Sequence, residues 1–302
     1  MNLRNVDMNS LRQRRFPSIV PYLFLLPALL ILGLAVFYPA WQAFSLSFTQ
    51  YDLDLTQAPQ WVGLKNFQRL WADQVFWQTL GNSVIYLLGV VPLLVFLPLV
   101  LAILVNQKMK GMAFFRLAYY TPVIISMVVA GIAWKALYAS DGILNQILRL
   151  GGLSEGVPWL TSPQWALASV MVVTIWKGLG YYMVIYLAGL QGIPPELYEA
   201  AALDGSDGWQ RHWHITLPLM APYLLLVAVI SSIAALKVFE EVYIMTQGGP
   251  LNHSKTVVYY IYQRAFQDLD INYASAMGLV LFVAIFIFSL LNLKLSRNSP
   301  HL

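Results

Sequence analysis

Side chains that could do covalent or metal chemistry are sparse in this sequence. It contains no cysteine, which excludes disulfides, thiolate nucleophiles and thiolate metal ligands. His212 and His214 lie two residues apart, so on a helix they point in different directions and make a poor metal pair. No Gly-x4-Gly-Lys-Ser/Thr string, the loop that cradles ATP phosphates, is present. We therefore expect no enzyme activity, catalytic residue, metal site or cofactor in this chain.

The charged residues best placed to bind a solute or take part in chemistry are three lysines inside or beside apolar runs, Lys135, Lys177 and Lys237. Lys177 is the deepest, because 14 residues separate it from Gln191, which corresponds to roughly 20 Å of helix. An ionised group at such a depth costs roughly 3 kcal/mol or more unless it is paired or hydrated. Two interpretations are open: a lysine that snorkels or forms an ion pair with Glu240 or Glu241, or a lysine that lines a water-filled cavity.

The surroundings of Lys177 suit a cavity for a polyhydroxylated solute. The stretch WKGLGYY (Trp176–Tyr182) combines aromatic rings, hydrogen-bond donors and glycines. A sugar presents apolar C–H faces and a rim of hydroxyl groups, which such side chains can contact. Further along, a face of small residues recurs at helical spacing: Ser231, Ala234, Ala235 and Val238. The alternative interpretation of that face is close helix packing through small residues.

Membrane-spanning helices must position these residues. Of the 302 residues, 59% are hydrophobic and 11% are charged, and the mean hydropathy is +0.63, whereas a soluble domain carries about 25% charged residues. A transmembrane helix needs about 20 apolar residues. The sequence predicts an all-α polytopic membrane protein with one transmembrane domain over 20–294, between tails 1–19 and 295–302. Its six spans are expected at about 20–45, 80–105, 114–137, 165–190, 217–243 and 272–293.

The distribution of lysine and arginine predicts the orientation of the spans. If the N-terminus is cytoplasmic, the inner segments hold ten of these residues and the outer loops five. Both termini should then be cytoplasmic, in a multi-pass protein of the cell (inner) membrane. The net charge of +4 is spread thinly along the chain rather than in a basic stripe, so no nucleic-acid partner is expected.

By this topology the most polar segment, EAAALDGSDGWQRHWHITLP (Glu199–Pro218), lies on the cytoplasmic side between spans four and five. The pair Pro194-Pro195 favours a helix start, and Glu196 suits the positive end of its dipole. Gly205 can take the left-handed conformation that ends a helix. The pattern predicts a short, rigid helix with small residues that permit close approach of a partner. An ordinary turn between two spans is the alternative.

This segment closely resembles the EAA signature of ABC-importer permeases. The pattern is Glu-Ala-Ala, then Asp-Gly, an aromatic, and Ile-x-Leu-Pro, matched here by Glu199, Ala200, Ala201, Asp204, Gly205, Trp213, Ile215, Leu217 and Pro218. Trp213 stands where phenylalanine is usual, and Ser206 where alanine is common. The Asp-Gly pair, AGLQGIP (Ala188–Pro194), TQGGP (Thr246–Pro250) and the six-span layout look like the carbohydrate-uptake, maltose-type branch. The element GLKNF (Gly63–Phe67) looks like the first permease of the pair that these systems use.

The resemblance implies a function for each part. The cytoplasmic segment would be a coupling helix that docks in a groove of a cytoplasmic ABC ATPase dimer, and that dimer, not this chain, would bind ATP and Mg. The other partners would be a second homologous permease, an extracytoplasmic solute-binding protein and the sugar substrate. The family places substrate contacts on spans four and five, which nominates a pathway set: Lys177, Gly178, Tyr181, Ser231, Ala235 and Val238.

We therefore expect a permease subunit that forms half of the translocation pathway for a sugar or sugar-like solute by alternating access. One alternative is a permease for an anionic relative of sugars, such as a glycerol phosphate, because three lysines lie in the outer half. A different class is a stand-alone secondary transporter. That class predicts inverted repeats and intramembrane acids for ion coupling, and neither is visible in the sequence.

Overall fold

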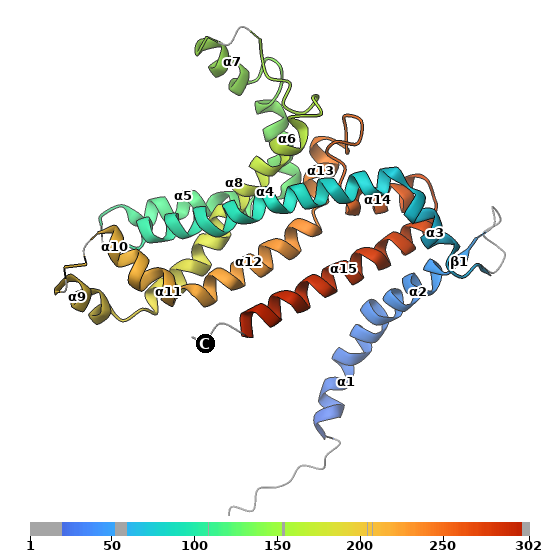
Figure 1. Ribbon diagram of the computed structural model, residues 1–302, viewed down its shortest axis with the longest axis horizontal. Coiled ribbons are helices and arrows are strands. Elements are labelled where there is room, and N and C mark those ends of the chain that lie inside the picture. The colour runs from blue at the N-terminus through green and yellow to red at the C-terminus, as the bar shows by residue number, and fades with distance from the viewer. Residues whose placement is uncertain are drawn as a thin grey trace, which may run out of the picture.

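The computed structural model describes residues 20–51, 59–107, 109–152, 155–203, 205–206 and 208–297. The expected tail 1–19 and the end of the C-terminal tail lie outside them. Helices dominate the described chain (Figure 1), and its strands are a two-residue antiparallel pair, β1 (Thr49–Gln50) and β2 (Gln60–Trp61). The predicted all-α class with membrane-spanning helices is thus confirmed.

The centre of the molecule is the long helix α4 (Gln74–Val105), against which α8 (Ala166–Gln191) and α12 (Ala221–Leu236) pack. At about 1.5 Å per residue, the 32 residues of α4 reach about 48 Å, more than the 30 Å core of a bilayer. Pro92 and Pro98 lie inside α4 without ending it. Buried side chains such as Tyr86 of α4 join the three helices into one apolar core.

The first span consists of α1 (Val20–Leu32), the π-helical turn η2 (Gly33–Phe37) and α2 (Tyr38–Ser47). Only its C-terminal part touches the rest of the chain, where α2 packs on α15 (Ile271–Arg297). The helix projects away from the other spans (Figure 1), and none of its most apolar window is buried within this chain. The N-terminal part of this span, α1, is therefore left uncovered by the described chain.

The expected third span, 114–137, is not one continuous helix. It is divided into α5 (Met112–Ile124) and α6 (Met127–Leu137), which meet at 101°. Two extended residues separate them, and the Ser126 side chain accepts a hydrogen bond from an amide in the first turn of α6. The apolar composition hid this break, because hydropathy does not register a helix cap. After α6 the chain forms α7 (Ile143–Leu150) and returns through α8.

The expected fifth span, 217–243, is also interrupted. The helical stretch α10 (Trp209–Arg211), η3 (His212–Thr216) and α11 (Leu217–Leu219) meets α12 at 68°. Pro222 follows this bend, and its ring cannot be accommodated against the carbonyl four residues earlier in a straight helix. A second break follows α12 and is succeeded by the short helix α13 (Glu240–Met245). The described chain therefore has four uninterrupted candidate spans, or six if each bent pair counts as one.

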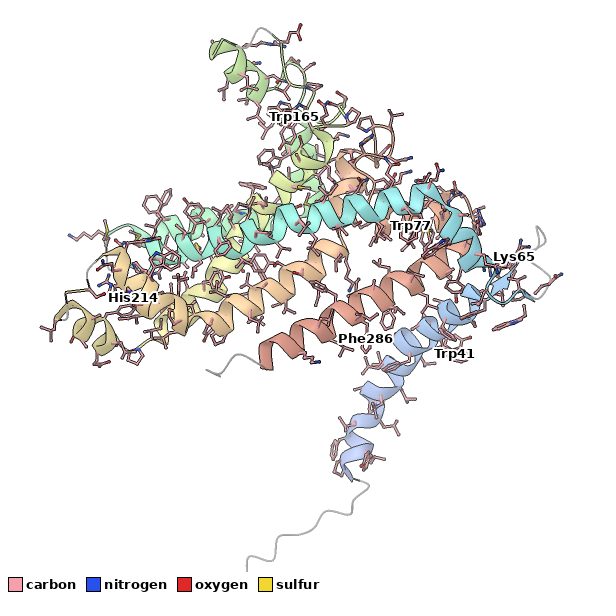
Figure 2. All side chains as sticks on the ribbon, viewed as in Figure 1. Trp41, Lys65, Trp77, Trp165, His214 and Phe286 are labelled. Carbon is pink, nitrogen blue, oxygen red and sulfur yellow. The ribbon has the colours of Figure 1, made fainter. Side chains whose placement is uncertain are left out.

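Two opposite ends of the molecule carry the connecting segments. At one end lie the β-hairpin, α3 (Lys65–Ala72), α14 (Val257–Tyr262) and η4 (Gln263–Gln267). At the other end lie α9 (Pro195–Leu203) and α10, so Lys65 and His214 are far apart along the long axis (Figure 2). These are the ends that the charge distribution assigns to the outside and to the cytoplasm.

The outer end is held together by two asparagines. Asn66, from the GLKNF element, is buried, and its amide donates to the carbonyls of Ser47 and Thr49 at 3.0 and 2.9 Å. Asn272, at the start of α15, donates to Leu46 and Thr49. These contacts fix the chain direction after α2 and join the first span to the last.

Candidate functional site

The polar segment predicted on the cytoplasmic side folds as a short helix and a tight turn. α9 (Pro195–Leu203) begins at the predicted proline. Its end is closed by hydrogen bonds from the Gly205 amide to the Ala202 carbonyl, 3.2 Å, and from the Ser206 amide to the Ala201 carbonyl, 2.8 Å. Gly205 has a φ of +76°, which confirms the left-handed helix end predicted for it.

Polar contacts connect α9 to the base of the fifth span. The Tyr198 hydroxyl lies 3.1 Å from the Thr216 hydroxyl, which also lies 3.0 Å from Nδ1 of His212 in η3 (His212–Thr216). The guanidinium of Arg211 stacks 5.3 Å from the Tyr198 ring centre. Thr216 is fully buried. A displacement of α9 would therefore be passed to the helix that leads into α12.

Apolar side chains on this segment have no cover within the described chain. Leu203 is 90% exposed, Trp209 62% and Trp213 58%. The nine residues nominated from the signature divide by exposure. Glu199, Ala200, Gly205, Trp213 and Pro218 are exposed, Ala201, Ile215 and Leu217 are half-buried, and Asp204 lies outside the described residues. A face of this kind suits contact with another protein.

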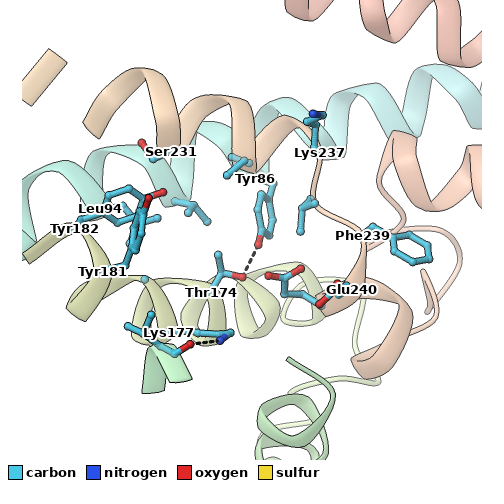
Figure 3. A pocket seen from close by; sticks show the side chains of 17 residues that line it. Tyr86, Leu94, Thr174, Lys177, Tyr181, Tyr182, Ser231, Lys237, Phe239 and Glu240 are labelled. Carbon is cyan, nitrogen blue, oxygen red and sulfur yellow. Dashed lines mark hydrogen bonds between the residues drawn. The ribbon is translucent and has the colours of Figure 1, made fainter. Parts of the chain in front are cut away.

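The six residues nominated for the solute pathway all line one cavity of about 440 Å³. The cavity lies between α4, α8 and α12, and Figure 3 shows Tyr181, Tyr182 and Ser231 at one end of it and Phe239 at the other. Val238 belongs to the break after α12 rather than to the helix. A cavity of this size accommodates a small ligand. The structure thus brings the nominated residues together, although those of α8 and α12 are 50 or more positions apart along the chain.

Lys177 has backbone partners. Its ammonium donates to the carbonyl oxygens of Ile125, Pro122 and Val123 at 2.6, 3.3 and 3.3 Å. These carbonyls lie at and just beyond the C-terminal end of α5, where helix carbonyls have no intrahelical donor and a cation is favoured. Among the described residues Lys177 forms no ion pair within 4 Å. The lysine both lines the cavity and holds the α5–α6 break against α8.

Several residues that line the cavity were not identified from the sequence. Tyr86 comes from α4, and its hydroxyl lies 2.5 Å from that of Thr174 on α8 (Figure 3). Glu240 and Glu241, considered above only as ion-pair partners, line the cavity themselves. A tyrosine hydroxyl and a threonine inside otherwise apolar runs were the available signals. These signals do not show that α4 lines the cavity, because that depends on which helices are neighbours in the fold.

A second polar cluster, at the outer end, joins α4 to α14 and α15. Asp73 begins α4 by accepting from two backbone amides, and its other oxygen accepts from the hydroxyls of Tyr260 and Tyr273 at 2.7 and 2.6 Å. Burial alone would raise the pKa of Asp73, but these four hydrogen bonds together hold it below its ordinary value. Arg264 donates to the Tyr260 hydroxyl at 2.7 Å. We interpret this cluster as structural.

Comparison with known proteins identifies the family. Residues 71–298 match the family described as "Binding-protein-dependent transport system inner membrane component". The chain belongs to this family. It is also similar to the lactose transport system permease protein LacF of Rhizobium radiobacter, with 33% identity over 291 residues that cover 94% of this chain and 96% of the relative.

Solved structures agree with this assignment. A bacterial ABC transporter that imports the acidic polysaccharide alginate contains a chain that superposes with a TM-score of 0.84 at 25% identity, covering 93% of this chain and 96% of its own. A second structure, of a bacterial alginate ABC transporter in complex with an alginate pentasaccharide-bound periplasmic protein, gives a TM-score of 0.80 at 26% identity over 92% and 94%. This chain is therefore an ABC-importer permease, a transport subunit and not an enzyme.

Proposed function

We propose that this permease forms half of the pathway through which a neutral sugar or oligosaccharide is imported by alternating access. The cavity between α4, α8 and α12 carries this proposal. Its tyrosines Tyr181 and Tyr182 offer ring faces for C–H groups. Ser231 donates its hydroxyl proton to the Val227 carbonyl at 2.6 Å, so its oxygen remains available to accept from a solute hydroxyl.

The charges of the cavity favour a neutral solute over an anionic one. Two lysines, Lys177 and Lys237, and two glutamates, Glu240 and Glu241, line it. The lysines and glutamates balance, and the Lys177 ammonium is already occupied by three carbonyls. An anionic solute remains the second candidate, because a similar solved transporter imports the acidic polysaccharide alginate. A stand-alone secondary transporter is not pursued, since the chain belongs to a binding-protein-dependent family.

The coupling role is proposed for α9 and the turn that follows it. The exposed Leu203, Trp209 and Trp213 form an apolar face suited to a groove of a cytoplasmic ATPase dimer, which would bind the ATP and Mg. The full proposed contact set is Glu199, Ala200, Ala201, Asp204, Gly205, Trp213, Ile215, Leu217 and Pro218. The hydrogen bonds of Tyr198 and Thr216 would pass the motion of α9 to α12 as a rigid-body displacement.

The proposed arrangement includes a second permease and six spans with both termini in the cytoplasm. The bare flank of α1 supports a second membrane subunit, since none of its apolar window is buried by this chain. The opposite placement of α9 and the β-hairpin supports the orientation (Figure 1). A solute-binding protein at the outer end is supported by the solved complex of a similar transporter with its periplasmic protein.

The test is reconstitution from parts. We expect the tagged chain, co-expressed with a second permease and an ABC ATPase from the same source, to purify with both. ATP hydrolysis by this complex in lipid nanodiscs should rise when sugar-loaded binding protein is added. Uptake of a sugar by vesicles that contain this chain alone, without an ATPase, would refute the proposal.

A further inference from the structure

A second cavity, which we call the outer pocket, lies at the C-terminal end of α6. It has a volume of about 550 Å³ and lies between α6, α7, the segment 156–161 and the end of α13. Lys135, Tyr138, Arg149 and Trp159 contribute its largest side chains. In Figure 1, α7 projects away from the long helices, and the Lys135 and Arg149 side chains at the pocket are exposed.

The outer pocket is preformed. Asn145 of α7 is fully buried at its base. Its amide nitrogen donates to the carbonyls of Ala139 and Val157, and its oxygen accepts from the Val157 amide and the Trp159 indole. Tyr138 packs against Trp159 with ring centres 5.5 Å apart. A ligand therefore meets walls that are already ordered, which lowers the entropic cost of binding.

The charge of this pocket is uniformly positive. Among the described lining residues Lys135 and Arg149 are charged and no carboxylate is present. Lys135 donates to the Ile244 carbonyl at 3.4 Å, and Arg149 donates to the Ser140 carbonyl at 3.0 Å. Neither forms an ion pair with a described residue, and both side chains are exposed. The two cations thus have donor capacity left for an anionic ligand.

We infer that the outer pocket receives an acidic side chain of the solute-binding protein. This inference rests on the proposed function, because it requires a binding protein that docks at the outer end. The contrast between the two cavities favours this occupant over the solute itself. The translocation cavity is lined by two lysines and two glutamates, whereas the outer pocket is lined by two cations and no carboxylate, with Asp141 and Glu155 adjoining lining residues in the chain. A solute matched to the first cavity would not need the second.

The helix α13 links the two cavities. Its first residues, Glu240 and Glu241, line the translocation cavity, and its last residue, Met245, lines the outer pocket. α6 packs tightly on α13, since a Cβ added at Gly131 would lie 2.8 Å from the Ile244 side chain. An acidic side chain drawn between Lys135 and Arg149 would therefore press on an element whose other end borders the solute. Docking and opening of the pathway would share α13 as a rigid connection.

The experiment uses the assembled importer in nanodiscs of uncharged lipid, with ATP hydrolysis measured against the concentration of sugar-loaded binding protein. We expect Lys135→Glu and Arg149→Glu each to raise the half-maximal concentration about tenfold at low ionic strength. The difference should shrink as salt increases. Lys65→Glu is the matched control, because it makes the same charge change at the outer end, outside the pocket.

Three other outcomes would contradict the inference. An unchanged half-maximal concentration in both variants would overturn it. An equal rise of the half-maximal concentration in Lys65→Glu would show that the overall electrostatic field of the outer surface, and not the pocket, attracts the binding protein. A change in the sugar concentration needed at saturating binding protein would assign the pocket to the solute. Lys135→Gln and Arg149→Gln serve the same test if a reversed charge prevents assembly. Absent stimulation of the unmodified importer would instead count against the proposed function.

Discussion

At the scale of the residue, the position of Lys177 is explained by what surrounds its ammonium rather than by a charged partner. Sequence reasoning placed the lysine deep in a span and left an ion pair and a cavity open. The three carbonyls that it contacts belong to residues 52 to 55 positions away. No local pattern could have named them, because they are exposed by the break between α5 and α6.

We predict that Lys177→Met lowers the stability of the purified complex by about 1–3 kcal/mol and reduces sugar uptake, because it leaves buried carbonyls without a donor. Lys177→Arg should keep most of both, since a guanidinium also donates. Thermal unfolding in detergent and uptake by whole cells are the measurements. If Lys177→Met transports normally and is as stable as the unmodified protein, the lysine does not hold the break.

A second residue-scale prediction concerns Asp73. Its pKa is lowered in the folded protein, so its contribution to stability is complete above the ordinary value of 3.8 and is lost as the pH falls through the lower native pKa. Asp73→Asn keeps an oxygen for the helix cap but loses the tyrosine hydrogen bonds. We expect this variant to melt earlier near pH 7 and to approach the unmodified protein in strong acid.

The control for this titration is Asp268→Asn, which removes an exposed ion pair with Arg264. It should have a smaller effect near pH 7, because exposed ion pairs contribute little. Identical pH profiles of Asp73→Asn and the unmodified protein would show that Asp73 does not stabilise the fold.

At the scale of the element, the sequence located most helices but not their interruptions. Hydropathy found the apolar segments, and the proline and glycine of the polar segment marked where α9 begins and ends. The 101° and 68° bends were missed, because each expected span was continuous in composition. Close contact between helices was equally hidden, since it depends on tertiary neighbours.

Gly180 provides the test of helix contact. A Cβ at this position of α8 would overlap the backbone carbonyl of Tyr119 in α5. We predict that Gly180→Ala destabilises the purified protein by about 1–3 kcal/mol, since α5 must move away. Gly33→Ala is the matched control, because its Cβ would meet nothing within 4 Å. Equal melting temperatures for the two variants would contradict the close packing of α5 on α8.

The end of α9 can be tested in the same manner. Gly205→Val places a β-branched side chain at a φ of +76°, which is strained by about 1–2 kcal/mol. We expect uptake and stimulated ATP hydrolysis to fall while the permease still inserts in the membrane. Gly192→Ala, at an ordinary helical φ of −81°, should retain both activities. Normal uptake by Gly205→Val would remove this turn from the coupling path.

At the scale of the whole molecule, two groups of segments lie at opposite ends. α9 and α10 lie at one end, and the hairpin with α3 lies at the other (Figure 1). Charge counts predict that the α9 end is cytoplasmic and that the hairpin end faces outside, and this orientation stays a prediction. The sequence could not predict that the outer pocket would form, because Lys135 and Arg149 come from different elements.

This orientation is measurable because the chain has no cysteine of its own. We predict that Leu203→Cys reacts with a membrane-impermeant maleimide only after cells are opened, whereas Trp61→Cys reacts in cells whose inner membrane is intact. Both positions are well exposed, at 90% and 70%. Reaction of Leu203→Cys from outside would reverse the topology and end the proposed coupling role of α9.

The uncovered flank of α1 has a consequence for how the cell must make this protein. In a copy without the second permease proposed above, the apolar window of the first span would face lipid, and only the α2 end would be held by this chain. We expect such orphan copies to be degraded faster than paired ones, so that synthesis of the two permeases in equal amounts is a requirement of the architecture.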